Sequence, residues 1–287
     1  MKILDGKVVA NKLTLELKNE FAAVTKELGR KPILAIVFVG NNPASEKYIA
    51  KKIAKADELG VETQVYSFPE KIRYKQLLKK MDEINEIADG IIVQLPLPES
   101  INTYTQPILD AVRFEKDVDG LSSRNSFNFY NKTKDFYFTP ATAQAIMELL
   151  DYYNIDFDGK RVAVIGRSLL VGKPTANLLK TRNVGQVSTH NRESGIKGVE
   201  NADILVVAAG VPHLINKKNI KEDAVVVDVG STLVEEDGTK CLRGDVDYTD
   251  LENHISALAP SPGGVGHLTV VCLFRNLLRA VKNNNDL

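Results

Sequence analysis

The feature that most constrains the fold of this chain is the repeated alternation of short apolar runs with polar stretches of helical period. In the first half the runs ILAIVFVG, ETQVYSFP and GIIVQLPLP begin at residues 33, 62 and 90, with amphipathic stretches between them. Near-continuous apolar strands joined by helices are typical of parallel sheets that are covered on both faces. The pattern therefore predicts an α/β fold.

The rhythm stops between about Asp117 and Pro140, where Asn, Ser, Phe and Tyr dominate, and this break predicts a domain boundary. It resumes with the helix-like ATAQAIMELLDYYNI, then KRVAVIG, a helix over 173–181, GQVSTH, ADILVVAAG, AVVVDVG and the closing helical segment HLTVVCLFRNLLRAVKNN. Four short strands with helical connections predict a doubly wound, Rossmann-like nucleotide-binding sheet. A length of 287 residues is enough for about two domains.

Composition argues against several classes of partner. The 37 basic and 37 acidic residues cancel, so no excess positive field draws the chain to nucleic acid or anionic membrane. Cys241 and Cys272 are far apart, which argues against a disulfide framework and a Cys-based zinc site and fits a reducing cytoplasm. Charges near the start leave no export signal, and no run approaches the length of a membrane span. We expect no bound metal.

A candidate dinucleotide turn follows the strand that ends at Ile165. The segment GRSLLVGKP presents Gly166, Arg167 and Ser168 between this strand and a helix for which Pro174 suits the first turn. Unpaired backbone N–H groups at such a turn can hold a pyrophosphate. The spacing departs from GxGxxG, because Ser168 replaces the second glycine, so the motif alone is weak and fits a ligand-free turn equally well.

The end of the next strand bears on which cofactor is bound. It reads His190-Asn191-Arg192, whereas a site for the unphosphorylated dinucleotide usually has Asp or Glu there. Arg167 and Arg192 together suit a 2′-phosphate, which favours NADP. If Glu193 instead faces the ribose, NAD is preferred, so both cofactors stay open.

The second candidate site is in the first half. Asn42, Pro43 and Gly60 predict the start and stop of a helix on which Tyr48 and Lys52, four residues apart, share one face. This face begins at the carboxyl end of a strand, where open α/β sheets bind ligands.

Gln94 should lie on the same rim, at the end of strand GIIVQ. An aromatic ring, an amine and an amide would then converge.

Each of these residues also has an ordinary structural explanation. Lysines in a helix with four of them are usually solvated charges, and composition does not separate Lys51 from Lys52. The KDVDG segment at 116–120 is by composition a turn whose aspartates bond local backbone. Its functional interpretation is a carboxylate paired with nitrogen donors of a ligand.

Several motifs, in order, resemble one known family. They are VGNNPASEKYIAKK, DGIIVQLPLP, EKDVDG, GRSLLVGKP and PSPGGVGHLTV. Together they are similar to the bifunctional methylenetetrahydrofolate dehydrogenase/cyclohydrolases over nearly the whole chain, and the first of them selects Lys52 over Lys51.

The resemblance implies an activity and a set of site residues. The expected reactions are oxidation of 5,10-methylenetetrahydrofolate with NADP and hydrolysis of the methenyl product to 10-formyltetrahydrofolate in one cleft between the domains. Lys52 would be the main catalytic group, Tyr48 would pack on the folate, Gln94 would tune Lys52, and Asp119 would grip the pterin. A lysine with a lowered pKa can exchange protons with water near neutrality.

Domain boundaries and further ligand contacts follow from the same resemblance. A folate-binding, catalytic domain is expected at 1–139, completed by a C-terminal helix at 267–287, and a dinucleotide-binding domain at 140–266. The expected cofactor contacts are Gly166, Arg167, Ser168, Asn191, Arg192 and Ser231, and the further substrate contacts are Pro262, Gly263 and Gly264. A cytoplasmic homodimer that pairs through its cofactor-binding domain is also expected.

The chain departs from the family pattern at several positions. They are Ala141 and Ala143 in the segment PATA, the stretch Asn125-Ser126-Phe127-Asn128-Phe129, and Asn191, Ser231 and His267. Because several of them border the cofactor or the cleft, they leave open the cofactor preference and the ratio of the two activities. The alternatives are a monofunctional member, a two-domain dehydrogenase of the shikimate dehydrogenase kind, and a non-catalytic binding protein.

Overall fold

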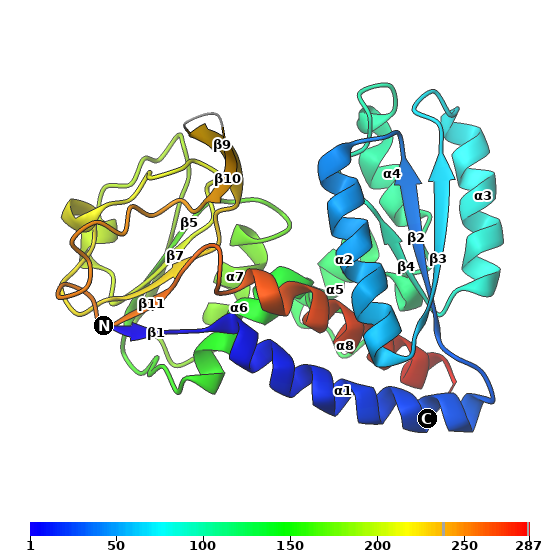
Figure 1. Cartoon of the computed structure of the whole chain (residues 1–287), viewed down its shortest axis with the longest axis horizontal. Helices are drawn as coiled ribbons and strands as arrows, with labels where there is room; N and C mark the ends of the chain where they lie inside the picture. The colour runs from blue at the N-terminus through cyan, green and yellow to red at the C-terminus, as the bar shows by residue number, and fades with distance from the viewer. Residues whose placement is uncertain (237–238, 286) are drawn as a thin grey trace. The chain divides into compact units, whose positions relative to one another are not determined.

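The computed structural model describes residues 1–236, 239–285 and 287, and the chain divides into two compact units (Figure 1). The six-stranded unit contains Met1–Asn11 and Thr142–Thr269, and the three-stranded unit contains Lys12–Ala141 and Val270–Leu287. Expectations for residues 237, 238 and 286, the last within the expected helix 267–287, lie outside the described residues. The main sheet of each unit has parallel strands, so the α/β prediction is confirmed.

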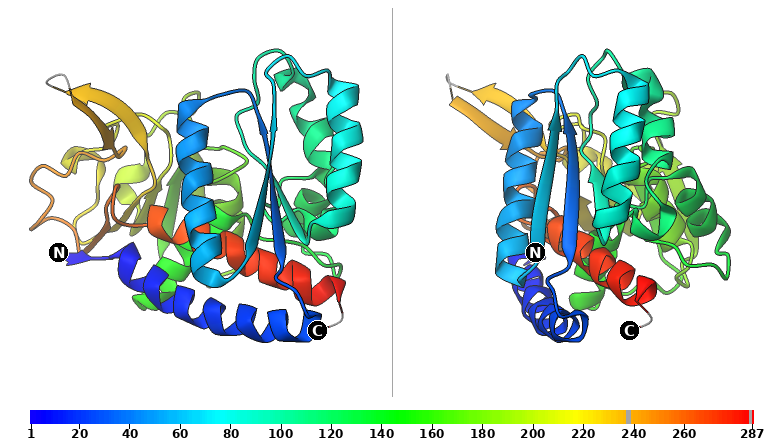
Figure 2. Two further views of the ribbon diagram at one scale, coloured as in Figure 1. Left: turned by 45° about the vertical axis from the view of Figure 1, so that its right-hand side comes forward. Right: turned by 90° about the vertical axis from the view of Figure 1, so that its right-hand side faces the viewer.

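The sheet of the three-stranded unit has the order β3-β2-β4. Its strands are β2 (Ile33–Val39), β3 (Glu62–Phe68) and β4 (Gly90–Val93), which match the three apolar runs. Figure 2 shows α2 (Pro43–Leu59) on one face and α3 (Tyr74–Ile87) on the other, beside α4 (Thr105–Asp110). Leu77, Met81 and Ile84 of α3 pack on alternate residues of β2 and β4, because side chains of a strand alternate between its faces.

The predicted ends of α2 are confirmed. Asn42 caps the helix, and its side-chain oxygen accepts hydrogen bonds from the backbone N–H groups of Ala44 and Ser45 at 3.0 and 3.1 Å. Gly60 ends the helix with φ of 76°, in the left-handed region that glycine adopts readily. These two caps fix where Tyr48 and Lys52 lie along the helix.

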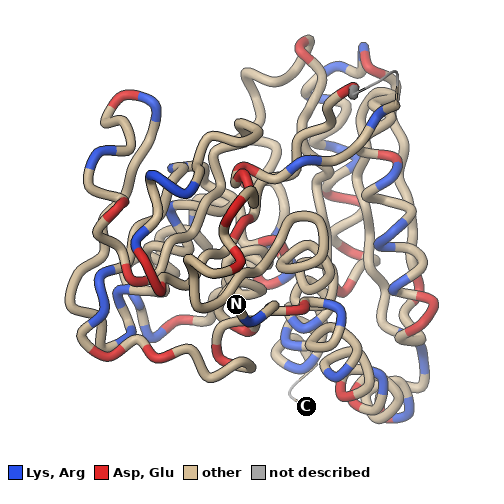
Figure 3. Tube along the Cα trace, turned by 60° about the vertical axis from the view of Figure 1, so that its left-hand side comes forward, with Lys and Arg blue, Asp and Glu red and all other residues tan. Residues whose placement is uncertain are grey.

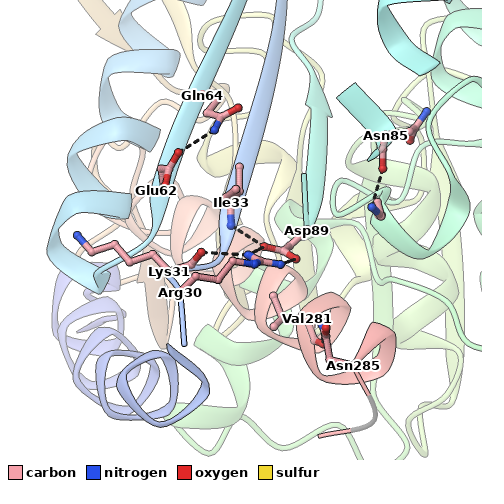
Figure 4. Close-up of polar contacts among 10 residues, drawn as sticks. Arg30, Lys31, Ile33, Glu62, Gln64, Asn85, Asp89, Val281 and Asn285 are labelled. Carbon is pink, nitrogen blue, oxygen red and sulfur yellow. Dashed lines mark hydrogen bonds and ion pairs between the residues drawn. The ribbon is translucent and has the colours of Figure 1, made fainter. Parts of the chain in front are cut away.

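The amino ends of β2 and β4 are held together by one carboxylate (Figure 4). Asp89 accepts two hydrogen bonds from the Arg30 guanidinium, at 2.7 and 2.8 Å, and one from the Ile33 backbone N–H at 2.7 Å. This paired fork geometry is among the stronger charge-assisted contacts. It anchors the sheet at the edge opposite the carboxyl ends of the strands.

The six-stranded unit has the strand order β1-β11-β8-β7-β5-β6. The four predicted strands are present as β5 (Arg161–Ile165), β6 (Gln186–His190), β7 (Ile204–Val207) and β8 (Val225–Asp228). Two strands that were not predicted, β1 (Lys2–Ile3) and β11 (Ala257–Ala259), extend the sheet beyond β8. The first eleven residues therefore group with this unit, whereas the expected boundary put them in the other.

The remaining elements complete the two units. They are α1 (Gly6–Leu28), α5 (Ser123–Asn131), α6 (Ala141–Tyr152), α7 (Gly172–Leu179), α8 (Gly266–Asn284), the antiparallel hairpin β9 (Thr232–Glu236) and β10 (Thr239–Arg243), and 3₁₀ turns at Asn102–Tyr104, Phe114–Lys116, Val199–Asn201 and Lys217–Asn219. Basic and acidic residues are interspersed along the chain (Figure 3). None of the helices in the described part of the chain has the length and apolar character of a membrane span.

Candidate active site

The structure brings two of the predicted site residues into direct contact. The Nζ atom of Lys52 on α2 donates a hydrogen bond of 2.9 Å to Oε1 of Gln94. Gln94 directly follows β4, and its backbone N–H donates to the carbonyl oxygen of Val37 at 2.8 Å. The parallel pairing of β2 and β4 puts the end of β4 beside the start of α2. The contact therefore lies at the carboxyl edge of the sheet, where α/β folds bind ligands.

Lys52 and Asp119 are coupled through their charges. Burial lowers the pKa of the Lys52 amine, and the negative charge of Asp119 partly opposes this shift. Burial also raises the pKa of the Asp119 carboxyl, which the positive charge of Lys52 partly opposes. Among the described residues no hydrogen bond to the Asp119 carboxylate is formed. The Lys52 amine, which loses its proton more easily, therefore lies near the Asp119 carboxylate, which can accept hydrogen bonds from a ligand.

The two aspartates of KDVDG have different roles. Asp117 is buried and accepts hydrogen bonds from the backbone N–H groups of Gly120, Leu121 and Ser122 at 3.1, 3.2 and 2.7 Å. The local-turn interpretation of this segment therefore applies to Asp117. None of these three hydrogen bonds involves the carboxylate of Asp119. Burial raises the pKa of Asp117 to about 7 despite these hydrogen bonds.

Two buried asparagines, neither of them among the predicted site residues, hold this loop and the segment that packs beside it. The side-chain amide of Asn276 on α8 donates to the carbonyl oxygens of Val118 and Thr139 at 2.9 and 2.8 Å. Asn125 both donates to the Phe138 carbonyl oxygen and accepts from its N–H. The available signal was a lone Asn on the apolar face of a helix, since buried polar groups are generally hydrogen-bonded.

Tyr48 does not take part in the hydrogen bond between Lys52 and Gln94. Its side chain lies on α2 but is half exposed, at 48%. The cation over its ring is Lys51, whose Nζ is 5.6 Å from the ring centroid. Lys51 and Lys52, which composition could not separate, thus differ in structure: one is an exposed partner of an aromatic ring and the other is turned into the unit toward Gln94.

The predicted dinucleotide turn joins β5 to α7. Gly166 has φ of 106°, and a Cβ atom there would lie 2.1 Å from the Ala208 carbonyl oxygen. The Ser168 hydroxyl accepts hydrogen bonds from the N–H groups of Val171 and Gly172 at 3.1 and 3.5 Å. Only glycine fits at 166, so the turn stays narrow. Arg167 and Ser168 are exposed at the end of β5, together with the apolar side chains of Leu169 and Leu170.

The two arginines follow adjacent strands. Arg167 follows β5 and donates to the Thr189 carbonyl oxygen at 2.9 Å, and Arg192 is exposed just after β6, which pairs with β5. Asn191 is engaged in a local turn, in which its side-chain oxygen accepts from the Ser194 N–H at 2.9 Å. These residues fit a phosphorylated dinucleotide, because two guanidinium groups and a narrow turn lie at neighbouring strand ends. Glu193 is also exposed there.

The expected substrate contacts Pro262, Gly263 and Gly264 lie in the segment between β11 and α8. The backbone here is packed against the start of α1: the Gly6 N–H donates to the Gly263 carbonyl oxygen at 3.1 Å. A Cβ on Gly6 would meet the Gly264 carbonyl oxygen at 1.8 Å, so the close backbone approach is to this helix. Pro262 is exposed at the carboxyl end of the sheet, as is Ser231 after β8.

The residues that depart from the family pattern have ordinary structural roles. Ala141 and Ala143 are buried in the first turn of α6. The stretch 125–129 forms part of α5, inside which Asn125 is fully buried. His267 is exposed in the first turn of α8.

Comparisons with known proteins cover both units. A family model described as "Tetrahydrofolate dehydrogenase/cyclohydrolase, catalytic domain" matches residues 4–119, and one described as "Tetrahydrofolate dehydrogenase/cyclohydrolase, NAD(P)-binding domain" matches residues 140–285. The chain is 46% identical to a Bifunctional protein FolD of Mycoplasmopsis synoviae, over 98% of this chain and 100% of the relative. It is 39% identical to a Bifunctional protein FolD of Listeria innocua, over 98% and 97%.

Solved structures agree with these relatives. The bifunctional methylenetetrahydrofolate dehydrogenase/cyclohydrolase FolD of Campylobacter jejuni superposes with a TM-score of 0.91 at 35% identity, covering 99% of both chains. The Trypanosoma brucei enzyme, solved with NADP and an inhibitor, has a TM-score of 0.90 at 32% identity, covering 98% of this chain and 97% of the other. Matches at this identity over both units do not favour the shikimate dehydrogenase alternative. The chain belongs to the tetrahydrofolate dehydrogenase/cyclohydrolase family.

Proposed function

We propose that this protein oxidises 5,10-methylenetetrahydrofolate to the methenyl form with NADP and hydrolyses that product to 10-formyltetrahydrofolate. The observation that carries the proposal is the contact of Lys52 with Gln94, in a unit where burial lowers the pKa of the amine and Asp119 lies nearby. The names of the relatives, which describe bifunctional enzymes, support the same pair of activities. Such an enzyme takes part in one-carbon metabolism.

In the hydrolytic step Lys52 is the group that handles the proton. Water adds to the methenyl carbon and must lose a proton as the new C–O bond forms. The C–N5 bond then breaks, its electron pair stays on N5, and the proton of the new hydroxyl moves to N5 to leave the formyl group on N10. A neutral amine accepts this proton, and the lowered pKa makes the neutral form available closer to neutral pH. The hydrogen bond from Nζ to Gln94 fixes the direction of the amine.

Asp119 and Tyr48 are assigned to folate binding. The Asp119 carboxylate accepts hydrogen bonds from the N–H groups of the pterin, because such a paired acceptor suits adjacent ring donors. The exposed ring of Tyr48 provides an aromatic surface for the folate. Pro262, Gly263 and Gly264 are proposed as further substrate contacts.

The dinucleotide is assigned to the six-stranded unit, which includes most of the expected domain at 140–266. The folate is assigned to the three-stranded unit, which includes most of the expected domain at 1–139 and its C-terminal helix, but not the first eleven residues. A bound NADP would supply the acceptor for the hydride that leaves the methylene carbon. Gly166 and Ser168 border the pyrophosphate, and Arg167 and Arg192 bind the 2′-phosphate, with Asn191 and Ser231 as further contacts. Both arginines are exposed at adjacent strand ends, which supports NADP over NAD.

The test is an assay of the purified protein for both activities, with shikimate as an additional substrate. We expect reduction of NADP in the presence of methylenetetrahydrofolate and hydrolysis of methenyltetrahydrofolate, with weaker turnover of NAD. Folded protein without either activity contradicts the proposal. Loss of one activity alone identifies a monofunctional member, and ligand binding without turnover identifies a binding protein.

We also propose that the protein is a cytoplasmic homodimer that pairs through the six-stranded unit. Leu233 of β9 and Leu242 of β10 are directly paired across the hairpin, and both are exposed. Adjacent exposed leucines are typical of surfaces that become covered. Light scattering should give twice the chain mass, and Leu233→Glu should lower it. Cys241 and Cys272 do not form a disulfide with each other, as expected in a reducing compartment.

A further inference from the structure

A second cluster of polar contacts lies in the six-stranded unit, centred on Asp228. This last residue of β8 is 1% exposed, and its two carboxylate oxygens accept four hydrogen bonds. Oδ1 accepts from the N–H groups of Gly230 and Asp245 at 2.9 and 3.0 Å. Oδ2 accepts from the Val246 N–H at 3.0 Å and the Tyr248 hydroxyl at 2.7 Å. A buried carboxylate with four donors is a strong anchor for the chain segments around it.

The Tyr248 hydroxyl connects this anchor to a further segment. It donates to Asp228 and accepts a hydrogen bond of 2.7 Å from the Ser261 backbone N–H. Burial raises the pKa of the Tyr248 phenol, so the hydroxyl keeps the proton that it donates. The Tyr248 hydroxyl also lies 3.4 Å from the Ser261 carbonyl oxygen, and the Ser261 hydroxyl donates to the Gly230 carbonyl oxygen. Tyr248 and Ser261 thus tie the segment after β11 to the end of β8.

Asp245 extends the cluster to β7. Its Oδ2 atom accepts from the N–H groups of Ala209 and Gly210, at 2.6 and 2.9 Å, just beyond the end of that strand. Strands β11, β8 and β7 are adjacent and parallel, so their carboxyl ends lie along one edge of the sheet. Ligands of open α/β sheets bind at this edge. The cluster around Asp228 therefore holds together three of the loops at the carboxyl edge of this sheet.

We propose that the Tyr248 hydroxyl is a positioning group for the segment Ser261–Gly264 and that it sets the affinity for the folate without altering that for the dinucleotide. This inference rests on the proposed function, which assigns Pro262, Gly263 and Gly264 to the substrate. The selectivity follows from which contacts depend on the hydroxyl. Removing it takes away the hydrogen bond of the Ser261 N–H and leaves Ser261 tied to the end of β8 by its own hydroxyl. The three backbone donors to Asp228 remain and keep the loops after β7 and β8 in place.

The test compares Tyr248→Phe with Tyr153→Phe as a matched control. Tyr153 is in the same unit, and its hydroxyl also bridges backbone groups: it accepts from the Asp5 N–H at 3.0 Å and donates to the Asp5 carbonyl oxygen at 3.2 Å. Both variants should melt a few degrees below the wild type, because each loses a similar pair of contacts. If the role of Tyr248 is purely structural, this loss of melting temperature is the only effect expected of Tyr248→Phe.

A positioning role predicts a difference in kinetics. Tyr248→Phe should raise KM for methylenetetrahydrofolate about fivefold with kcat nearly unchanged, as expected for a lost ground-state contact. Its Kd for NADP should stay within about twofold of the wild type, as should all constants of Tyr153→Phe. An unchanged KM for the folate in Tyr248→Phe, or an equal loss of NADP affinity, overturns the inference.

Hydrogen exchange provides a readout that does not need turnover. The Ser261 amide should exchange about tenfold faster in Tyr248→Phe than in the wild type and keep its protection in Tyr153→Phe. If the Ser261 amide is equally protected in both variants, Tyr248 does not position Ser261 and the inference is overturned. Because this measurement needs no turnover, that result is distinct from failure of the proposed function. If Tyr248→Phe does not fold, the wild type decides: a Ser261 amide that exchanges like an open loop amide overturns the inference.

Discussion

The amide of Gln94 presents its oxygen, and not its nitrogen, to the amine of Lys52. Oε1 accepts from Lys52 Nζ at 2.9 Å, and Nε2 donates to the Leu95 carbonyl oxygen at 2.8 Å. The second contact fixes the orientation, because a reversed amide would place two donors against each other at Lys52 and two acceptors at Leu95. The amine is therefore held by a neutral acceptor, beside the charge of Asp119.

This arrangement predicts opposite pH shifts for two substitutions. If hydrolysis needs the neutral amine of Lys52, kcat rises with pH as that amine loses its proton. Gln94→Glu places a negative charge against the amine, raises its pKa and moves the rising limb to higher pH by about one unit or more. Asp119→Asn removes a charge that raises the pKa of Lys52, so the limb moves to lower pH. Profiles of kcat at saturating substrate check this, and shifts in the same direction would refute the assignment of the base.

Asp117 predicts a pH dependence of stability. Its pKa is raised by burial to about 7, above the ordinary value of 3.8, so the folded chain binds more protons than the unfolded chain between these values. The contribution of this group to the free energy of unfolding is therefore present at about pH 4 and lost as pH rises to about 7. Asp117→Asn should flatten the fall of Tm over this range. A variant whose Tm changes with pH as steeply as that of the wild type would contradict the prediction.

The exposed arginine after β6 predicts cofactor selectivity. Arg192→Ala should raise KM for NADP about tenfold and change KM for NAD by less than about twofold, because only the 2′-phosphate loses its partner. Arg161→Ala is the control, since Arg161 begins β5 at the opposite end from the turn. Initial rates with each dinucleotide give KM for NADP and KM for NAD in both variants. Equal effects on KM for both cofactors would show that Arg192 does not bind the 2′-phosphate.

Asn276 predicts a coupled loss of stability and substrate affinity. Asn276→Leu leaves the carbonyl oxygens of Val118 and Thr139 without their donor, which should cost about 1–3 kcal/mol of unfolding free energy. Because Val118 directly precedes Asp119, KM for the folate should also rise. Asn283→Leu, at an exposed position of the same helix, should change neither quantity. Urea titration measures the unfolding free energy, and steady-state kinetics measure KM for the folate. A variant with wild-type stability and a raised KM would contradict the predicted coupling.

The sequence predicts much of the fold because its strands are contiguous apolar runs between helical stretches. It does not predict β1, since two residues carry no period and their pairing with β11 joins opposite ends of the chain. Nor does it predict α5, whose Asn, Ser and Phe residues show no simple amphipathic pattern although Asn125 and Asn128 face inward.

The candidate site was predictable only in part. Tyr48 and Lys52 could be placed on one helix from its caps, but periodicity could not distinguish Lys51 from Lys52, because the choice depends on contact with Gln94, 42 residues away. Asn276 and Tyr248 were missed for the same reason. Their partners lie on other elements, and a single polar residue gives no local pattern.

The most direct test of the account is the cyclohydrolase rate of Lys52→Ala beside that of Lys51→Ala. The two lysines are neighbours on α2, but only Lys52 contacts Gln94, whereas Lys51 lies over the Tyr48 ring. Lys52→Ala should lower kcat for hydrolysis of methenyltetrahydrofolate by about 100-fold or more, as expected for loss of a general base, with Kd for NADP unchanged. Lys51→Ala should retain most activity. A fully active Lys52→Ala enzyme, or an equal loss in both variants, would contradict the account.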